Sequence, residues 1–108
     1  MILKFTKAGL PYYLNVKELV YAEADDKICY AYFSNGEQYT YSYGLVTLQE
    51  EVKKSCTFVR AHRSYLFNLS YFLCCKLKKA VLTTGKRLPL SRNKIALLKR
   101  YQRMKKKR

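Results

Sequence analysis

Acidic residues are absent from more than half of this sequence. All seven lie within the first 51 residues, where four bases stand against seven acids, giving a net charge of −3. The remaining 57 residues hold 18 bases and no acid, a net charge of +18. A small chain with this excess of positive charge attracts a polyanion. For the terminal run at 105–108, the alternative is that the lysines only keep a surface hydrated.

Long hydrophobic runs are also absent. No apolar segment is long enough to cross a bilayer. Lys4 and Lys7 interrupt the N-terminal segment, which therefore lacks the continuous apolar stretch of a secretory signal. Anionic lipid is an alternative polyanion, but the apolar stripe expected near the C-terminus is too narrow to anchor a membrane helix. We therefore expect a soluble, cytoplasmic protein with no membrane partner.

The chain has few of the groups that support catalysis or metal binding. It has one histidine, and its four cysteines lack the CxxC spacing of common zinc sites. Motifs of the forms GxxxxGK[ST], GxGxxG and HExxH are missing. We expect no enzymatic activity, no metal and no cofactor, and we expect reduced thiols, as is usual in the cytosol. The cysteines are Cys29, Cys56, Cys74 and Cys75.

Short segments rich in tyrosine, valine, isoleucine, threonine and phenylalanine, separated by turn signals, predict a mostly β domain. An Asn-Gly pair at 35–36 and Gly85 predict two tight hairpins. A capping box that begins at Thr47 predicts a short helix to about Lys54, and Ser91 is expected to cap a C-terminal helix. We expect one domain over 1–104, a basic tail at 105–108 and no internal repeat. The predicted strands are 2–7, 12–16, 19–24, 28–33, 38–43, 57–61, 70–77, 80–84 and 87–90.

Two ordered blocks carry a resemblance to a known family. The segment FVRAHRSYLFNLSYF at 58–72 is similar to a family signature that runs Phe-x-Arg-x-His-Arg-Ser-x-Leu-Val-Asn-Leu and continues into a hydrophobic strand. The segment LTTGKRLPLSR at 82–92 is similar to the strand, Thr-x-Gly hairpin and Leu-Pro-Val/Ile-Ser-Arg block that follows it. The chain thus resembles the LytTR DNA-binding domains of bacterial transcription regulators over about residues 10–100.

The resemblance implies an elongated β-sheet domain with one short internal helix and a C-terminal helix. In this family, loops and strand ends enter successive major grooves of bent DNA. Arg63 and Arg92 match base-contacting positions, and an arginine fork can bond both O6 and N7 of guanine. A third reading position falls in the loop at 25–27, where Lys27 is the candidate. The family often has a polar or basic residue there, whereas two aspartates precede Lys27 in this chain.

Residues that flank these positions are candidates for phosphate contacts, which position a protein on DNA without reading sequence. Arg60 and His62 alternate with apolar residues along a predicted strand, so either is also a candidate for bracing a loop. Asn68 is expected to shape the chain at the end of the motif. The candidate phosphate contacts are Arg60, His62, Ser64, Lys86, Asn93 and Lys94.

The resemblance predicts sequence-specific binding to double-stranded DNA as a transcriptional regulator. We expect direct repeats in promoters, with a homodimer on DNA as one arrangement. The chain starts and ends close to the resembling stretch, which suits a standalone regulator or an isolated domain, with control by expression level or a regulatory partner protein. The main alternative is a basic RNA or single-strand binder with aromatic stacking platforms. A protein-interaction module is a third alternative.

Overall fold

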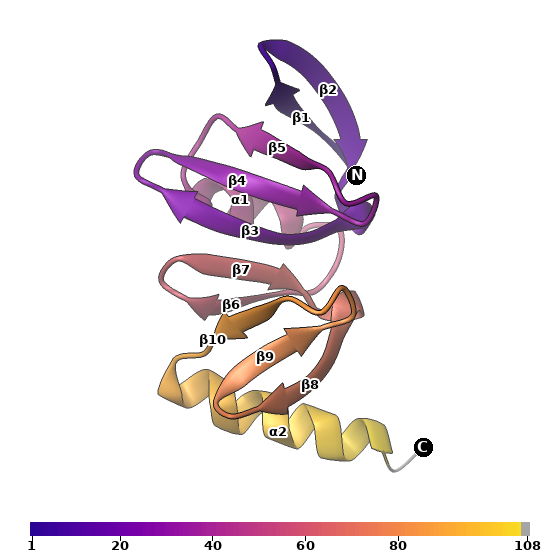
Figure 1. The fold of residues 1–108 in the computed structure, drawn as a ribbon, viewed down its shortest axis with the longest axis vertical. Coiled ribbons are helices and arrows are strands. Elements are labelled where there is room, and N and C mark those ends of the chain that lie inside the picture. The colour runs from indigo at the N-terminus through magenta and orange to yellow at the C-terminus, as the bar shows by residue number, and fades with distance from the viewer. Residues whose placement is uncertain (107–108) are drawn as a thin grey trace.

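The computed structural model describes residues 1–106 of an elongated, mostly β domain of 44 × 28 × 25 Å (Figure 1). The predicted fold class is confirmed: ten short strands carry most of the regular structure, with one short helix inside the chain and a longer one at its end. The strands are β1 (Ile2–Lys7), β2 (Leu10–Asn15), β3 (Leu19–Asp25), β4 (Ile28–Phe33), β5 (Gln38–Tyr41), β6 (Phe58–His62), β7 (Tyr65–Asn68), β8 (Phe72–Lys76), β9 (Lys79–Leu82) and β10 (Arg87–Pro89). The helices are α1 (Leu45–Val52) and α2 (Arg92–Lys106), with 3₁₀ turns η1 (Val16–Glu18) and η2 (Leu69–Tyr71).

The strands form two antiparallel sheets along the long axis. The larger sheet has the order β2-β1-β5-β4-β3-β7-β6, and the smaller has the order β10-β9-β8. α1 packs against β3, β6 and β7, and α2 packs against β8. Each sheet therefore has a helix to cover part of its apolar surface, as stable layered folds require.

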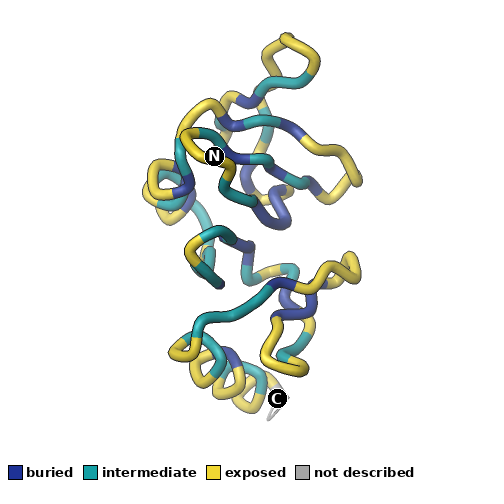
Figure 2. Tube along the Cα trace, turned by 60° about the vertical axis from the view of Figure 1, so that its left-hand side comes forward, coloured by how far each residue is buried: buried dark blue, intermediate teal, exposed yellow. Residues whose placement is uncertain are grey.

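Two hydrophobic cores lie one above the other. The first holds Phe5, Phe33 and Leu48, and the second holds Phe67, Leu88 and Leu98. Figure 2 shows these buried segments along the middle of the trace, while the exposed segments gather at turns and on the outer face of the C-terminal helix. The buried side chain of Asn68, 1% exposed, accepts from the Ser70 amide at 3.0 Å at the end of β7 and donates to the carbonyl of Leu19 at 3.1 Å. The structural role expected for Asn68 is confirmed.

The order of elements reveals a tandem repeat that the sequence analysis missed. Two strands, a 3₁₀ turn, three strands and a helix occur once from β1 to α1 and again from β6 to α2. Strand order repeats as well: the first unit reads β2-β1-β5-β4-β3, while the second reads β7-β6 followed by β10-β9-β8. An amide at Ser91 donates to the carbonyl of Ala61 at 2.8 Å, joining the two parts of the second unit.

Matching hydrogen bonds support the equivalence of the two units. In each unit an asparagine side chain accepts at 3.0 Å from the amide two residues on, at Asn15 and Asn68. The last hairpin of each unit also bonds back to its 3₁₀ turn, because Ser34 donates to the Glu18 carbonyl and Thr83 donates to the Tyr71 carbonyl, both at 2.8 Å. Few residues are identical between equivalent positions of the two units, so the sequence alone gave little indication of the repeat.

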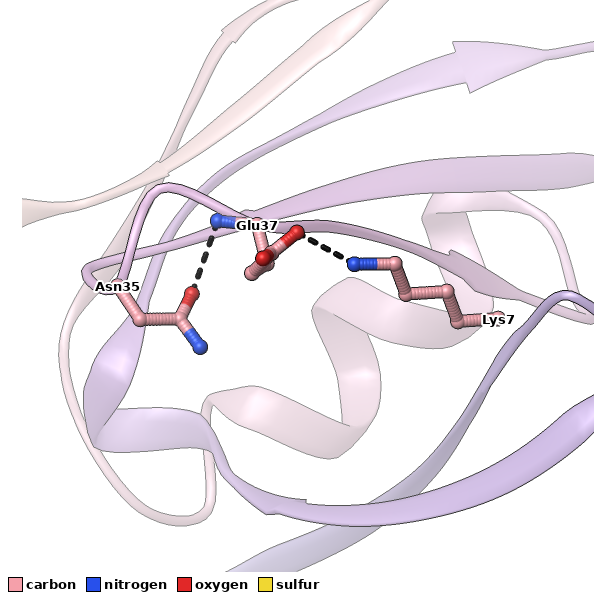
Figure 3. A network of polar contacts seen from close by, with 3 residues as sticks. All are labelled: Lys7, Asn35 and Glu37. Atoms are coloured by element: carbon pink, nitrogen blue, oxygen red, sulfur yellow. Dashed lines mark hydrogen bonds and ion pairs between the residues drawn. The ribbon is translucent and has the colours of Figure 1, made fainter.

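Glycines at positive φ form the two predicted hairpins. Gly36 has φ 84° and Gly85 has φ 91°, a region that only glycine enters without strain. Each glycine amide donates to the last residue of the preceding strand, at 2.9 and 2.8 Å. In the first hairpin the Asn35 side chain accepts from the Glu37 amide at 2.9 Å, and the Glu37 carboxylate pairs with Lys7 (Figure 3).

The structure corrects the prediction around residues 63–77. The sequence analysis placed no strand between His62 and Ser70, yet β7 lies there between β3 and β6. Leu66 and Phe67 are both fully buried, so β7 lacks the alternation of polar and apolar residues that marks a half-exposed strand. The predicted strand at 70–77 is in fact the end of η2 followed by β8.

The capping box predicted at Thr47 is also wrong. α1 begins at Leu45 after Gly44, and no side chain caps it. This earlier start buries Leu45 together with Leu48 and Val52. Burying each such side chain stabilises a fold by roughly 1.5 to 3 kcal/mol, compared with about 1 kcal/mol for an N-cap.

α2 follows Ser91 as predicted. Of the predicted stripe, Leu98 is 1% exposed and Tyr101 packs against the second core, while Ile95 is half-buried and lines a groove at the start of the helix. The helix continues to Lys106, which takes in the start of the basic tail. Lys107 and Arg108 lie outside the described residues. Neither helix in the described part of the chain is long and apolar enough to span a membrane.

Candidate nucleic-acid interface

Three turns meet along one long edge of the molecule. They are the β3–β4 turn at 25–27, the β6–β7 turn at 62–64 and the β10–α2 junction at 90–92, and we call them together the turn edge. All three lie on the left of the view in Figure 1. The turn edge contains every residue expected to read bases: Lys27, Arg63 and Arg92.

Backbone hydrogen bonds connect the three turns. The Ala24 amide donates to the Ser64 carbonyl at 2.8 Å, which joins the first turn to the second. The Ser91 amide donates to the Ala61 carbonyl at 2.8 Å, which joins the junction to the end of β6. The relative positions of the turns are thus set by the backbone, while the side chains of Lys27, Arg63 and Arg92 are exposed.

Arg60 braces the turn that presents Arg63. Its Nη2 donates to the Arg63 carbonyl at 2.7 Å and its Nε donates to the His62 carbonyl at 3.1 Å. The third nitrogen, Nη1, donates at 2.8 Å to the side-chain oxygen of Gln49 on α1. One half-buried guanidinium therefore holds both carbonyls of the turn and anchors them to a helix, which is the bracing alternative expected for this residue.

His62 also shapes the turn. Its Nδ1 accepts from the Ser64 amide at 3.3 Å, and this bond leaves the proton of the neutral ring on Nε2. A protonated Nε2 is a donor suited to a phosphate oxygen. Ser64 is half-buried beside it.

The start of α2 presents two more expected contacts. The Asn93 carbonyl oxygen Oδ1 accepts from the Ser91 hydroxyl at 2.9 Å, and the Lys94 amide donates to the Ser91 carbonyl at 3.0 Å. The Lys94 side chain is half-buried and that of Asn93 is exposed. Both follow Arg92 in the first turn of the helix, where the helix dipole favours a bound anion.

Lys86 is separated from the other candidates. It lies in the β9–β10 turn, where its Nζ is 5.6 Å from the centre of the Tyr21 ring. This turn lines a shallow pocket with Gly36 of the β4–β5 turn, on the edge opposite the turn edge. The structure therefore brings eight of the nine candidate residues to one side and leaves Lys86 on the other.

Two acidic side chains at the end of β3, beside the first turn of the turn edge, accept hydrogen bonds from tyrosines, while Asp26 in that turn is exposed. Tyr30 donates to Asp25 at 2.6 Å, and this hydrogen bond is the main reason why the pKa of Tyr30 is raised. Tyr65 donates to Glu23 at 3.3 Å, and the pKa of Tyr65 is raised chiefly by burial and then by the Glu23 charge. Both hydroxyls therefore stay protonated at neutral pH.

The positive charges of the second half of the chain are not neutralised by acidic side chains. The ion pairs within residues 1–106 are Lys7 with Glu37, Lys53 with Glu50 and Lys54 with Glu51. None of these involves a base beyond position 54. The basic side chains of the β6–β7 turn and of the β10–α2 junction therefore keep their full positive charge. Within the same residues, no three of the His, Cys, Asp and Glu side chains gather to hold a metal ion, and all four thiols are free.

Comparison with known proteins agrees with this geometry. The sequence model of the LytTr DNA-binding domain family matches residues 11–102. This chain belongs to the LytTR family. The LytTr DNA-binding domain of a Bacillus cereus protein described as a methyl-accepting/DNA response regulator has the same fold, with a TM-score of 0.74 and 19% identity over 92% of this chain and 94% of that one. A search of curated proteins gives no match.

Membership of the LytTR family makes this chain a DNA-binding domain of the kind used in transcription regulation. Two features beside the candidate residues escaped the sequence analysis. Gln49 was invisible as a brace because it is 11 residues from Arg60 and on another element. The β8–β9 turn, which lies beside Arg92, carries no family motif in this chain.

Proposed function

We propose that this LytTR domain binds double-stranded DNA sequence-specifically as a transcriptional regulator, with the turn edge laid along successive major grooves. Arg63 and Arg92 read bases, and Lys27 reads from the first turn. His62, Ser64, Asn93 and Lys94 bind flanking phosphates, and Arg60 holds the Arg63 turn in place.

The observation that carries this proposal is the convergence of Lys27, Arg63 and Arg92 on one edge. These residues are 29 or more positions apart in the sequence, yet backbone bonds between their turns fix them together. Arginine forks that are exposed on a rigid support are the groups best suited to guanine in the major groove.

The size of the domain suits this arrangement. Its long axis of 44 Å exceeds one turn of B-DNA, roughly 34 Å, so one edge can span two major grooves on the same face. Two copies on direct repeats about one helical turn apart would then lie on one side of the duplex.

Single-strand or RNA binding is less well supported. A stacking platform needs exposed aromatic rings beside cations. The exposed tyrosines are Tyr12, Tyr13 and Tyr43, all in the half of the chain that carries the acids, and Tyr21 beside Lys86 is only 7% exposed. The exposed tyrosine rings and most of the unpaired cations are therefore on different parts of the molecule.

The test begins with duplexes that the wild-type chain selects from a random library. Fluorescence anisotropy then compares the selected duplex, a scrambled duplex and a single strand, for wild type, Arg63→Ala and Arg92→Ala. Each substitution should reduce the preference for the selected duplex by roughly 5- to 150-fold, because a bidentate base contact contributes about 1 to 3 kcal/mol. Arg87→Ala is the matched control, since Arg87 is exposed at the opposite end of β10.

Two outcomes would refute the proposal. The selection could yield no common sequence, or single-stranded DNA could bind as tightly as the selected duplex with no effect of either substitution. The second outcome would favour the stacking alternative.

A further inference from the structure

The β8–β9 turn has a backbone that its residues disfavour. Leu77 and Lys78 form a two-residue loop closed by the pair Lys76 and Lys79. Their φ angles are 53° and 63°, so both are left-handed, as in a type I′ turn, where Asn-Gly is strongly preferred. A leucine and a lysine are strained in this conformation. Strained residues of this kind concentrate at functional sites.

The side chains of this turn are not used by the fold. Leu77 is 80% exposed, the most exposed large apolar residue among those described. Lys78 is also exposed and forms no ion pair or side-chain hydrogen bond with a described residue. Side-chain packing, ion pairs and hydrogen bonds within the fold therefore do not explain why positions 77 and 78 are a leucine and a lysine.

The position of the turn supplies a reason. β9 pairs with β10 so that Lys79 lies opposite Pro89, which places the turn beside the β10–α2 junction. Lys78, Arg92 and Lys99 line a groove of about 610 Å³ with an apolar floor. In the tandem repeat, this turn corresponds to the β3–β4 turn that carries Lys27. The β8–β9 turn therefore extends the turn edge past Arg92.

We propose that the β8–β9 turn is a fourth DNA-contacting element. Lys78 binds a DNA phosphate beside the major groove that Arg92 enters, and Leu77 packs against a thymine methyl group. This assignment rests on the proposed function. The left-handed backbone holds both side chains outward, at the cost of local strain that an Asn-Gly turn would not have.

The test replaces the turn by its preferred sequence, as Leu77→Asn with Lys78→Gly. This double variant should melt roughly 5 °C higher, because the strain is relieved, yet bind the selected duplex about tenfold more weakly, a loss of about 1.4 kcal/mol. Its plot of log affinity against log salt should be shallower by about one unit, the slope expected for one lost phosphate contact.

Ala8→Asn is the matched control. Ala8 has φ 53° and precedes Gly9 in the β1–β2 turn, at the far end of the molecule from α2 (Figure 1). This variant also creates an Asn-Gly turn and should gain stability with no change in DNA affinity. Lys78→Gly alone, which keeps Leu77, provides a second variant and should change the salt slope.

Uracil in place of thymine tests Leu77 separately. Removing the methyl groups of the selected duplex one at a time should weaken wild type at one position, and Leu77→Asn should not respond there. The assignment fails if the double variant keeps the wild-type affinity and salt slope while Arg63→Ala loses its sequence preference. A wild type with no sequence preference would instead refute the proposed function, and this assignment with it.

Discussion

At the scale of single residues, burial raises the pKa of two of the thiols, Cys29 and Cys75. Cys29 is fully buried and donates to the Tyr43 carbonyl at 3.3 Å. Burial raises its pKa from 9.0 to about 11, because a thiolate is poorly solvated there. Cys29 is therefore a core residue and an unreactive thiol, and the same physical effect raises the pKa of the half-buried Cys75.

The raised pKa of Cys29 predicts a loss of stability at alkaline pH. Between pH 9 and 11 the unfolded chain releases the proton while the folded chain keeps it, so stability falls as pH rises. Over this range wild type should lose up to about 2 kcal/mol more than Cys29→Ala. Urea unfolding of both proteins at several pH values between 8 and 11 measures the difference. Parallel pH profiles would mean that the thiolate is tolerated in the core.

At the scale of elements, α1 helps to hold the β6–β7 turn that carries Arg63. Its residue Gln49 contacts the guanidinium that holds the Arg63 turn, and its apolar face packs into the first core. The helix therefore connects the shape of the Arg63 turn to the packing of the sheet behind it. In the proposed function no recognition helix is needed, because rigid turns present the side chains that we propose to read bases.

Gln49→Ala should loosen the Arg63 turn without removing any charge. We expect the preference for the selected duplex over the scrambled one to fall about three- to tenfold, or about 0.7 to 1.4 kcal/mol. The salt slope and the affinity for scrambled DNA should stay unchanged, since no phosphate contact is lost. Gln38→Ala, at an exposed position of β5, is the control. An effect of equal size on both duplexes would contradict a positioning role.

At the scale of the whole molecule, charge is divided along the long axis. The unit from β1 to α1 contains all seven acids, and the unit from β6 to α2 contains none. The two units share one fold but differ in charge. The second unit, which carries the turns at 62–64 and 90–92, therefore provides most of the electrostatic attraction for DNA.

This distribution predicts a steep dependence of DNA binding on salt. If about five lysines and arginines of the second unit neutralise phosphates, the slope is about −4.5, which weakens binding about 500-fold between 50 and 200 mM salt. Titrations of the scrambled duplex at four salt concentrations measure this slope. A slope near zero would show that the positive charge does not engage the phosphates.

Several features followed from the sequence because they depend on local chemistry or on composition. Gly36 and Gly85 predicted their hairpins, since the positive φ of those turns favours glycine over any other residue. The ends of β1 and β4 were also predicted to the residue, because alternating apolar side chains and flanking turn residues mark half-buried strands. The absence of acids beyond Glu51 indicated a polyanionic partner. The two motif blocks indicated the LytTR family and supplied Arg63 and Arg92.

Tertiary structure decided the features that depend on residues far apart in the sequence. The start of α1 was set by the burial of Leu45 against the sheet, and β7 was hidden from the sequence because both of its faces are buried. Arg60 became a brace only because Gln49 lies beside it, and Lys86 was separated from the other candidates by the direction of β10. Charge and turn chemistry are local properties that a sequence displays directly, whereas neighbours across strands and helices exist only once the chain has packed.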